Sequence, residues 1–317
     1  MRIFYVTQGV HRTGGQFVNL DHVAALRRMG YDARFLFIRP DDEPPGVFTP
    51  EFPYGYEPPP WQTTLAGLTA DDVLSVGEMF GAGALAVADT PCRKVIHNQG
   101  PYYSFAAFGD VSAMAAWGAE AMILPSGFAA DMLARLGWTR PSHVVRPVLD
   151  PVFAAAQGPR RLQIAATPNR RPQEWRLIRG AVRSLRPDLG AVPWVEIKGL
   201  ARPGVARLMA SSEIFLALGQ LEGLGLPPLE AMATGALVVG FDGGGGREYA
   251  TPDNGDWFPD GAHLEIAETL ARRVDELRAG ETFEARRAAG RATAARFSQD
   301  NFEAQLAAAW AAIAGPP

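Results

Sequence analysis

Short apolar runs that are typical of β-strands alternate with helical patterns along the chain, in two successive series. The first series contains RIFYV, ARFLFI, DVLSV, RKVIH and AMILP, and the second contains RLQIAAT, PWVEIK, SEIFLAL and ALVVGF. Alternation of this kind is typical of βα units that build a parallel sheet with helices on its faces. The sequence therefore predicts an α/β protein with two Rossmann-like, doubly wound domains.

The chain length also favours two domains, because one hydrophobic core seldom serves all of 317 residues. The proline-containing stretch PVLDPVFAAAQGP, residues 147–159, separates the two series and predicts the boundary. We therefore expect an N-terminal domain over 1–153 and a C-terminal domain over 154–297. In 298–317, apolar side chains recur at helical spacing, which predicts an amphipathic helix that packs on another element.

The segment LEGLGLPPLEAMATGALVVGFDGGGGREY, residues 221–249, has the strongest indications of a binding site. SEIFLAL before it reads as a buried strand that opens into a glycine-containing loop, and Pro227 and Pro228 begin a helix. Ligands of open parallel sheets bind beyond the strand carboxyl ends, and a helix N-terminus there favours a phosphate. Glu222 would lie in the loop and Glu230 in the first helical turn, where each carboxylate can accept hydroxyl hydrogen bonds. The alternative is that Glu230 complements the helix dipole and Glu222 is solvated.

This segment resembles the donor site of retaining glycosyltransferases of family 4, which have the GT-B fold. The resemblance rests on Glu-x7-Glu with the intervening GLGLPPL and the following AMATG. It implies an acceptor-side domain and a nucleotide-sugar donor domain that face each other across a cleft, with the C-terminal helix returning to the first domain. It further implies that Glu222 lies near the donor sugar and that Glu230 binds the nucleotide ribose. The loop residues expected at the donor are Gly223, Leu224, Gly225 and Leu226.

Four glycines, residues 243–246, follow ALVVGF and lead into Arg247 and Glu248. Such a run at a strand end can form a nest of amide donors for an anion, or it can be a mobile turn. A glycine-rich loop that ends in glutamate stands beside the donor in family 4. The resemblance therefore assigns Gly244 and Gly245 to donor binding.

Adjacent cations occur in ATPNRRPQEWRLI, directly after the first strand of the second domain. Guanidinium groups match phosphate geometry and stabilise a departing nucleoside diphosphate. Family 4 members usually carry an arginine and a lysine here. Asn169 and Arg170 take these places if the sequences are aligned on the proline, whereas Arg170 and Arg171 do so if the loop is one residue longer. With this choice open, we predict a catalytic role for Arg170 and donor binding by Arg171.

In the first domain, Gly14 and Gly15 open a helix that continues as QFVNLDHVAALRRM. The spacing is not that of the dinucleotide fingerprint G-x-G-x-x-G, which argues against NAD. The two glycines could let the loop approach the donor phosphate or the acceptor, or they could form a plain tight turn. His97 ends RKVIH, where a histidine can be structural, but family 4 enzymes often place a histidine near the donor sugar in this loop. On that ground we predict His97 as a catalytic residue.

Between Pro40 and Pro60, many prolines surround Tyr54, Tyr56 and Trp61 in a segment too irregular for helix or sheet. A packed surface loop is the first interpretation, and a part of the acceptor site is the alternative.

The overall charge gives no reason to expect nucleic acid as a partner, because the net charge is only -4. A single cysteine, Cys92, fits a reducing cytosol.

No apolar stretch reaches the roughly 18 to 20 residues of a membrane span, so we expect a cytoplasmic protein, with peripheral contact at the inner membrane face if the acceptor is lipid-linked. No two aspartates stand two residues apart, so the Asp-x-Asp metal motif of the other large glycosyltransferase fold is absent. We therefore expect a metal-independent enzyme with no cofactor besides its nucleoside-diphosphate sugar substrate.

These features together predict a hexosyl- or deoxyhexosyltransferase that moves a sugar from a nucleoside diphosphate to a hydroxyl acceptor, with the retention that the resemblance implies. The acceptor could be a glycan, a lipid-linked compound or a small molecule. Two other functions fit the same fold. One is a nucleotide-sugar epimerase that needs no acceptor, and the other is a protein that binds a sugar nucleotide without catalysis.

Overall fold

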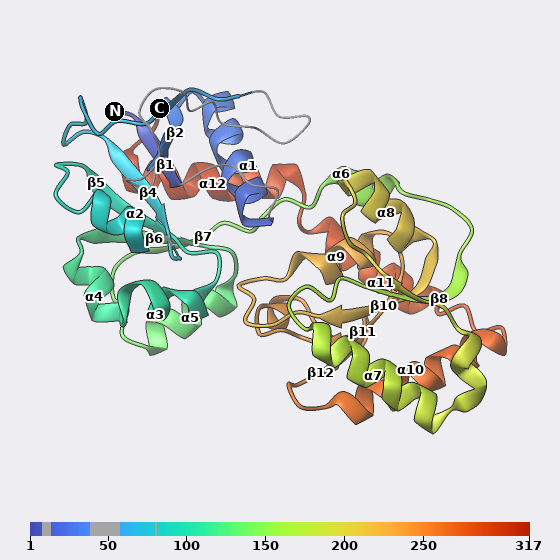
Figure 1. Cartoon of the computed structure of the whole chain (residues 1–317). Coiled ribbons are helices and arrows are strands. Elements are labelled where there is room, and N and C mark those ends of the chain that lie inside the picture. The colour runs from blue at the N-terminus through green and yellow to red at the C-terminus, as the bar shows by residue number, and fades with distance from the viewer. Residues whose placement is uncertain (8–13, 39–57, 80) are drawn as a thin grey trace. The chain divides into compact units, whose positions relative to one another are not determined.

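The computed structural model describes residues 1–7, 14–38, 58–79 and 81–317 (Figure 1). Tyr54 and Tyr56 of the proline-rich segment lie outside the described residues. The chain forms two compact units: unit 1 is Met1–Val148 with Gln299–Pro317, and unit 2 is Leu149–Ser298. Each unit contains a parallel sheet with helices, which confirms the predicted α/β class.

The sheet of unit 1 has the strand order β3-β2-β1-β4-β5-β6-β7, and every neighbouring pair is parallel. Its strands are β1 (Ile3–Thr7), β2 (Ala33–Phe37), β3 (Trp61–Gln62), β4 (Val73–Gly77), β5 (Arg93–His97), β6 (Ala119–Leu124) and β7 (Ser142–Val144). Trp61, expected in an irregular loop, instead pairs with Phe35 at the sheet edge.

Alternate residues of β1 face two different cores, as the two-residue period of a strand requires. Ile3 and Tyr5 pack with α1 and α12, whereas Phe4 and Val6 pack on the other face. Ser126 caps α5 as its position before GFAADML predicts, because its hydroxyl accepts a hydrogen bond from the amide of Ala129. The helices of unit 1 are α1 (Gly14–Arg28), α2 (Gly81–Ala86), η1 (Pro101–Tyr103), α3 (Ser104–Phe108), α4 (Val111–Ala116), α5 (Gly127–Arg135) and α12 (Gln299–Ala314).

The sheet of unit 2 has the order β12-β11-β10-β8-β9, and its neighbouring strands are also parallel. Its strands are β8 (Arg161–Ala166), β9 (Trp194–Glu196), β10 (Ser212–Leu218), β11 (Leu237–Phe241) and β12 (Asp256–Phe258). Its helices are α6 (Pro151–Ala155), α7 (Pro172–Leu185), η2 (Pro187–Ala191), α8 (Arg202–Ala210), α9 (Leu226–Ala233), η3 (Gly245–Glu248), α10 (His263–Arg278) and α11 (Glu284–Ala295).

The central strand β10 is buried on both faces, which explains its continuous apolar sequence. Ile214 and Leu216 pack with residues of α7 and α10, and Phe215 packs with residues of α8 and α9. The chain enters and leaves unit 2 at adjacent points. The amide of Leu149, at the entry, donates to the carbonyl of Phe297, near the exit, at 2.8 Å.

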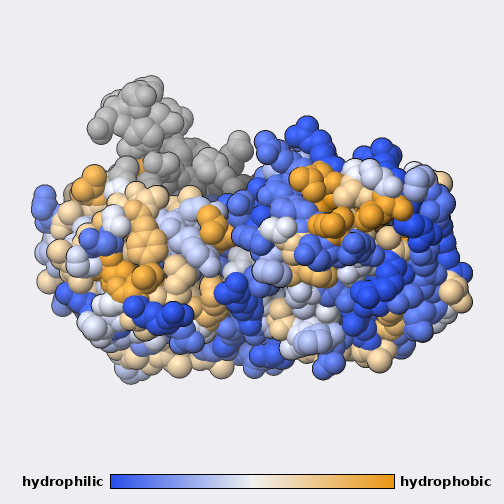
Figure 2. All heavy atoms as spheres, turned by 90° about the horizontal axis from the view of Figure 1, so that it is seen from below, coloured by the Kyte–Doolittle hydropathy of each residue, from blue (hydrophilic) through white to orange (hydrophobic). Residues whose placement is uncertain are grey.

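The visible surface of unit 2, on the right of Figure 2, is mostly hydrophilic, with one group of hydrophobic residues. Among the described residues, no helix combines the length and the apolar character needed to cross a membrane.

Candidate functional site

The order of the strands in unit 2 reverses between β8 and β10. The chain goes outward from β8 to β9 on one side, and from β10 to β11 and β12 on the other. Because β8 and β10 are parallel neighbours, the loops after them start at the same sheet edge. The crevice at such a reversal is where ligands bind in open α/β sheets. The two loops are residues 167–171 and 219–225, and they contain the predicted site residues Arg170, Arg171, Glu222, Gly223, Leu224 and Gly225.

Arg170 and Glu222 meet at this edge. The Nε atom of Arg170 lies 3.6 Å from Oε1 of Glu222, and the two side chains are 50% and 23% exposed. Burial raises the pKa of Glu222, and the charge of Arg170 opposes that rise. A cation and a carboxylate are therefore held together, within reach of a ligand, at the reversal of strand order.

Arg171 has a different environment from its neighbour. Its side chain is 4% exposed, and its guanidinium lies 4.4 Å from the ring centre of Phe241. It donates to the carbonyl of Gly219 at 2.9 Å and to the carboxylates of Glu174 and Asp260. These contacts occupy all three guanidinium nitrogens, so Arg171 ties the loop after β8 to the loop after β10. The sequence left two alignments open, one that pairs Asn169 with Arg170 and one that pairs Arg170 with Arg171. The burial of Arg171 favours the first alignment, in which Arg170 takes the place of the family's second cation.

The glycine run interlocks with the Glu222 loop. The amide of Glu222 donates to the carbonyl of Gly243 at 2.9 Å, and Glu222 and Gly244 form a parallel bridge. A Cβ atom on Gly245 would lie 2.4 Å from the amide nitrogen of Leu224, a distance that only glycine avoids. Asp242 accepts from the amide of Gly244 at 2.7 Å through its carboxylate. The run is thus an ordered turn, and at least this amide already has an acceptor.

Helix α9 starts at the end of the Glu222 loop. Gly225 precedes it with a φ of 84°, and the predicted prolines occupy its first turn. The hydroxyl of Tyr249 donates to the carbonyl of Gly225 at 2.7 Å and so holds this turn in place. The side chain of Leu224 is buried in the core, so this residue can contact a ligand at the loop only through its backbone.

Glu230 lies half-buried on α9, in the second turn and not in the predicted first turn, because the helix already begins at Leu226. Burial raises its pKa to about 7, while Arg202 opposes this rise and Asp150 adds to it. Arg202 is itself paired with Asp150 at 3.0 Å. Glu230 is therefore a carboxylate near its titration point at neutral pH, and it would gain from hydrogen-bond donors such as ribose hydroxyls.

Unit 1 has its own reversal of strand order, between β1 and β4. Gly14 and Gly15 begin α1 after β1, and Glu78 follows β4 directly. Glu78 is 5% exposed and accepts from the amide of Gln99 at 3.0 Å. Burial raises its pKa to about 7, opposed by backbone amides and, within the part of the chain that the structure describes, by no neighbouring cation. A buried carboxyl group with a perturbed pKa at a sheet edge is a feature of functional sites.

His97 lies beside this carboxyl-bearing loop, at the end of β5. It is 4% exposed, and its Nδ1 is 2.9 Å from Oδ1 of Asn19. Its ring packs against that of His22 with centres 4.5 Å apart and planes tilted by 33°. Burial lowers the pKa of His97 to about 3, so the imidazole is neutral at physiological pH.

Sequence reasoning missed several residues that hold these sites: Asn19, Glu78, Gln99 and Tyr249. Only Glu78 had a readable local signal, because it directly follows the buried strand run DVLSVG. The same reasoning had selected Glu222, which follows the strand SEIFLAL after a short loop.

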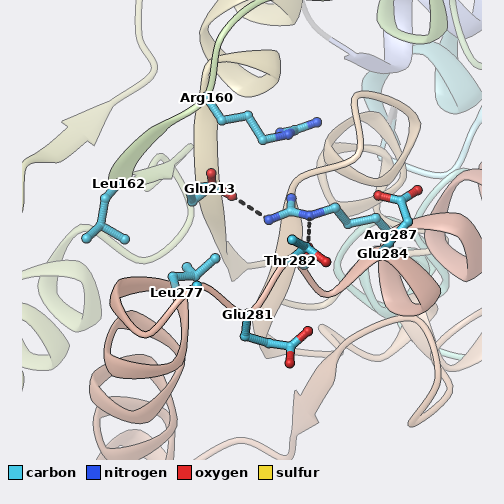
Figure 3. A pocket seen from close by; sticks show the side chains of 9 residues that line it. Arg160, Leu162, Glu213, Leu277, Glu281, Thr282, Glu284 and Arg287 are labelled. Carbon is cyan, nitrogen blue, oxygen red and sulfur yellow. Dashed lines mark hydrogen bonds and ion pairs between the residues drawn. The ribbon is translucent and has the colours of Figure 1, made fainter.

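A separate pocket of about 420 Å³ lies in unit 2 near the starts of β8 and β10, at the opposite strand ends from Arg170 and Glu222 (Figure 3). Arg287 projects into it and donates to Glu213 and to the carbonyl of Thr282. Its remaining nitrogen donates to the carbonyl of Gly235 at 2.6 Å. Since these bonds occupy the Arg287 guanidinium, it serves to hold the elements around the pocket together.

Comparison with known proteins gives consistent results. Residues 197–296 match the family model described as glycosyl transferases group 1. Over 274 residues the chain is 30% identical to an α-1,6-glucosyltransferase of Actinobacillus pleuropneumoniae serotype 7, covering 84% of this chain and 81% of that protein.

Solved structures resemble the chain over almost its full length. HepE of Anabaena, solved in complex with UDP-glucose, has a TM-score of 0.68 at 15% identity and covers 98% of this chain and 100% of its own. Sucrose-phosphate synthase of Thermosynechococcus elongatus has a TM-score of 0.68 at 14% identity and covers 99% of both chains. At these identities the likeness establishes the fold, which is GT-B.

Proposed function

The chain belongs to the group 1 glycosyltransferases, and we propose that it transfers a sugar from a nucleoside diphosphate to a hydroxyl acceptor. The observation that carries this function is the pairing of Arg170 with Glu222 at the reversal of strand order in unit 2. One side chain suits a diphosphate and the other suits sugar hydroxyls. Both are accessible, so a nucleoside-diphosphate sugar can engage both at once.

Each residue in unit 2 has a proposed role. Arg170 stabilises the negative charge that develops on the departing diphosphate, and Glu222 orients the sugar through its hydroxyls. Glu230 binds the ribose, and the turn at Gly244 and Gly245 lies beside the donor. For Arg171 the supported role is to hold the loop that presents Arg170, through its bonds to the carbonyl of Gly219 and to two carboxylates.

The preferred donor is UDP-glucose. HepE was solved with that compound, and the relative from Actinobacillus is a glucosyltransferase. We further propose retention of the anomeric configuration, as the sequence resemblance implies, and catalysis without a metal ion. Proton NMR of the first product reports its anomeric configuration, and assays with EDTA test the metal. Flotation with vesicles that contain a lipid-linked acceptor tests a membrane-bound substrate.

A screen of nucleotide sugars for thermal stabilisation and slow hydrolysis identifies the donor, because a ligand that binds only the folded state raises the melting temperature. Transfer is then measured for Glu222→Gln and Arg170→Ala, each with an expected loss of kcat/KM of about 100-fold or more. Glu268→Gln and Arg183→Ala are matched controls, since both residues are exposed on helices of unit 2 outside the site.

Near-normal transfer by both site variants would refute the assigned roles. If an epimeric nucleotide sugar forms without an acceptor, the protein is an epimerase and not a transferase. If a nucleotide sugar binds but is not turned over, the protein is a non-catalytic binding protein.

A further inference from the structure

Another exposed arginine lies at the same sheet edge of unit 2 as Arg170. Arg247 belongs to η3, which follows β11, and β11 is the neighbour of β10 in the sheet. The side chain of Arg247 is 61% exposed, and its Nε atom donates to Oδ2 of Asp242 at 3.2 Å. Arg170 has a similar setting, since it is half exposed and lies beside the carboxylate of Glu222. Each of the two arginines is therefore held by a carboxylate and open to solvent.

The two carboxylates lie around one hydroxyl group, that of Tyr249. A Cβ atom added to Gly225 would lie 3.4 Å from this hydroxyl and 3.8 Å from Cβ of Glu222. A Cβ atom added to Gly246 would lie 3.7 Å from the same hydroxyl and 3.6 Å from Cβ of Asp242. Burial raises the pKa of Tyr249, and the charges of Glu222 and Asp242 add to the rise. The carboxylate partners of the two arginines are thus neighbours at this edge.

Backbone bonds fix the turn that carries Arg247 against the loop that carries Glu222. The amide of Arg247 donates to the carbonyl of Gly244 at 3.2 Å, and Gly244 forms the parallel bridge with Glu222. Asp242 uses both of its oxygens, because Oδ1 accepts from the amide of Gly244 and Oδ2 accepts from Arg247. One carboxylate therefore orients both the turn and the arginine side chain.

The charge of a diphosphate calls for a second cation at this edge. The three loops that meet at Glu222 are residues 167–171, 219–225 and 242–249, and their cations are Arg170, Arg171 and Arg247. A guanidinium matches the geometry of one phosphate group, and a diphosphate has two. Arg171 does not supply the second cation, because it is buried and its three nitrogens are bonded within the protein. This leaves Arg247 as the partner of Arg170.

We propose that Arg247 is a second diphosphate-binding cation, so that Arg170 and Arg247 each bind one phosphate group of the ligand. Asp242 is then the positioning residue for Arg247. A phosphate can share Arg247 with Asp242, because a guanidinium has five N–H donors and the bond to Asp242 uses one of them. The proposal rests on the proposed function for the identity of the ligand as a sugar donor, whereas diphosphate binding is a property of the site alone.

Calorimetric titration of the full chain with inorganic pyrophosphate, UDP and UMP tests the proposal. Arg247→Gln can still donate to Asp242 but has no charge, so it should bind pyrophosphate and UDP about tenfold more weakly than the wild type. UMP should lose much less affinity, since Arg170 can hold its single phosphate. Arg247→Lys should recover part of the lost affinity, because its point charge still attracts phosphate.

The matched control is Arg183→Ala, which removes an exposed arginine of α7 outside the site and should leave all three affinities unchanged. Melting temperatures of all variants should equal that of the wild type, because Arg247 is exposed. Unchanged binding of pyrophosphate and UDP by Arg247→Gln would overturn the proposal. An equal loss for UDP and UMP, or no binding of pyrophosphate and UDP by the wild type, would also overturn it.

Transfer assays separate this proposal from the proposed function. Pyrophosphate has neither base nor sugar, so its binding does not depend on which nucleotide sugar is the donor. If the wild type transfers no sugar while Arg247→Gln still weakens pyrophosphate binding, the proposed function fails and the diphosphate site stands. If the wild type transfers sugar and Arg247→Gln does so with the same kcat/KM, the proposed function stands and the role of Arg247 fails.

Discussion

At the strand-order reversal of unit 2, Arg170 and Glu222 lie 3.6 Å apart as an accessible ion pair, whereas in unit 1 Glu78, Gln99 and His97 are held by neutral donors and acceptors. Both reversals lie at the carboxyl edge of a parallel sheet, so the backbone architecture is shared. The side chains differ in charge. A site for a diphosphate needs a cation, while a site for hydroxyl groups needs neutral or singly charged acceptors in fixed orientations.

The difference extends to the carboxyl groups. Arg170 counters the effect of burial on the pKa of Glu222, while at Glu78 none of the described cations counters it. We therefore expect the edge of unit 1 to be the more sensitive to pH, and the edge of unit 2 to be the more sensitive to loss of a charge.

The largest expected effect separates Arg170 from Arg171. Arg170→Ala should lower kcat/KM by about 100-fold and leave the melting temperature unchanged, because this side chain is half exposed. Arg171→Ala should instead reduce the free energy of unfolding by about 2–4 kcal/mol, since it removes a buried guanidinium that bonds to the carbonyl of Gly219 and to two carboxylates. Enzyme assays and thermal unfolding measure the two effects. A large activity loss in Arg171→Ala without destabilisation would assign the diphosphate to Arg171 instead.

The next effect concerns the pH dependence of stability in unit 1. The pKa of Glu78 is about 7 in the folded state and 4.5 in the unfolded chain. The buried, protonated carboxyl group therefore stabilises the folded state fully below pH 4.5, and this stabilisation is lost as the pH rises through 7. The lost contribution is about 3 kcal/mol. Glu78→Gln should therefore gain stability relative to the wild type over this range, as measured by urea unfolding at several pH values.

Glu230→Gln is the matched variant in unit 2, because the pKa of Glu230 is also about 7 and its sign is the same. Saturating nucleotide should flatten the pH dependence that is due to Glu230, since ribose hydroxyls stabilise its carboxylate, but it should not flatten that due to Glu78. An equal response of the two residues to nucleotide would break the assignment of the ribose to Glu230.

A smaller effect compares one glycine from each edge. Gly245→Ala should destabilise unit 2 by about 1–3 kcal/mol, because its Cβ would collide with the backbone at Leu224. Gly14→Ala should have little effect or stabilise α1 slightly, since no atom of the described residues lies within 4 Å of the added Cβ. Thermal unfolding of both variants tests this. A destabilised Gly14→Ala would show that the start of α1 also needs glycine.

The smallest effect comes from removing one tyrosine hydroxyl in each unit. Tyr249→Phe loses the bond to the carbonyl of Gly225, and Tyr31→Phe loses the bond to the carbonyl of Gly315. Each change should cost about 1 kcal/mol in the free energy of unfolding. Only Tyr249→Phe should also raise the KM for the donor, because Gly225 directly precedes the helix at the proposed donor site. Equal KM values in the two variants would argue against that role.

The sequence by itself determined the fold class and predicted the candidate site of unit 2. Strand runs, a proline-started helix and Glu-x7-Glu are local patterns, and local patterns set secondary structure and the ends of strands. That Glu222 and Arg170 share an edge follows from the same patterns, because both residues come after strands of one parallel sheet.

Only the tertiary structure decided which side chains are buried in fixed bonds and which are exposed at the sheet edge. Arg170 and Arg171 are adjacent and chemically identical in the sequence, and they differ because the carbonyl of Gly219 and the ring of Phe241 meet Arg171 alone. Asn19 and Gln99 likewise come together only when α1 packs beside β5. These contacts join residues far apart in the chain, and they depend on strand order and burial, which no local pattern encodes.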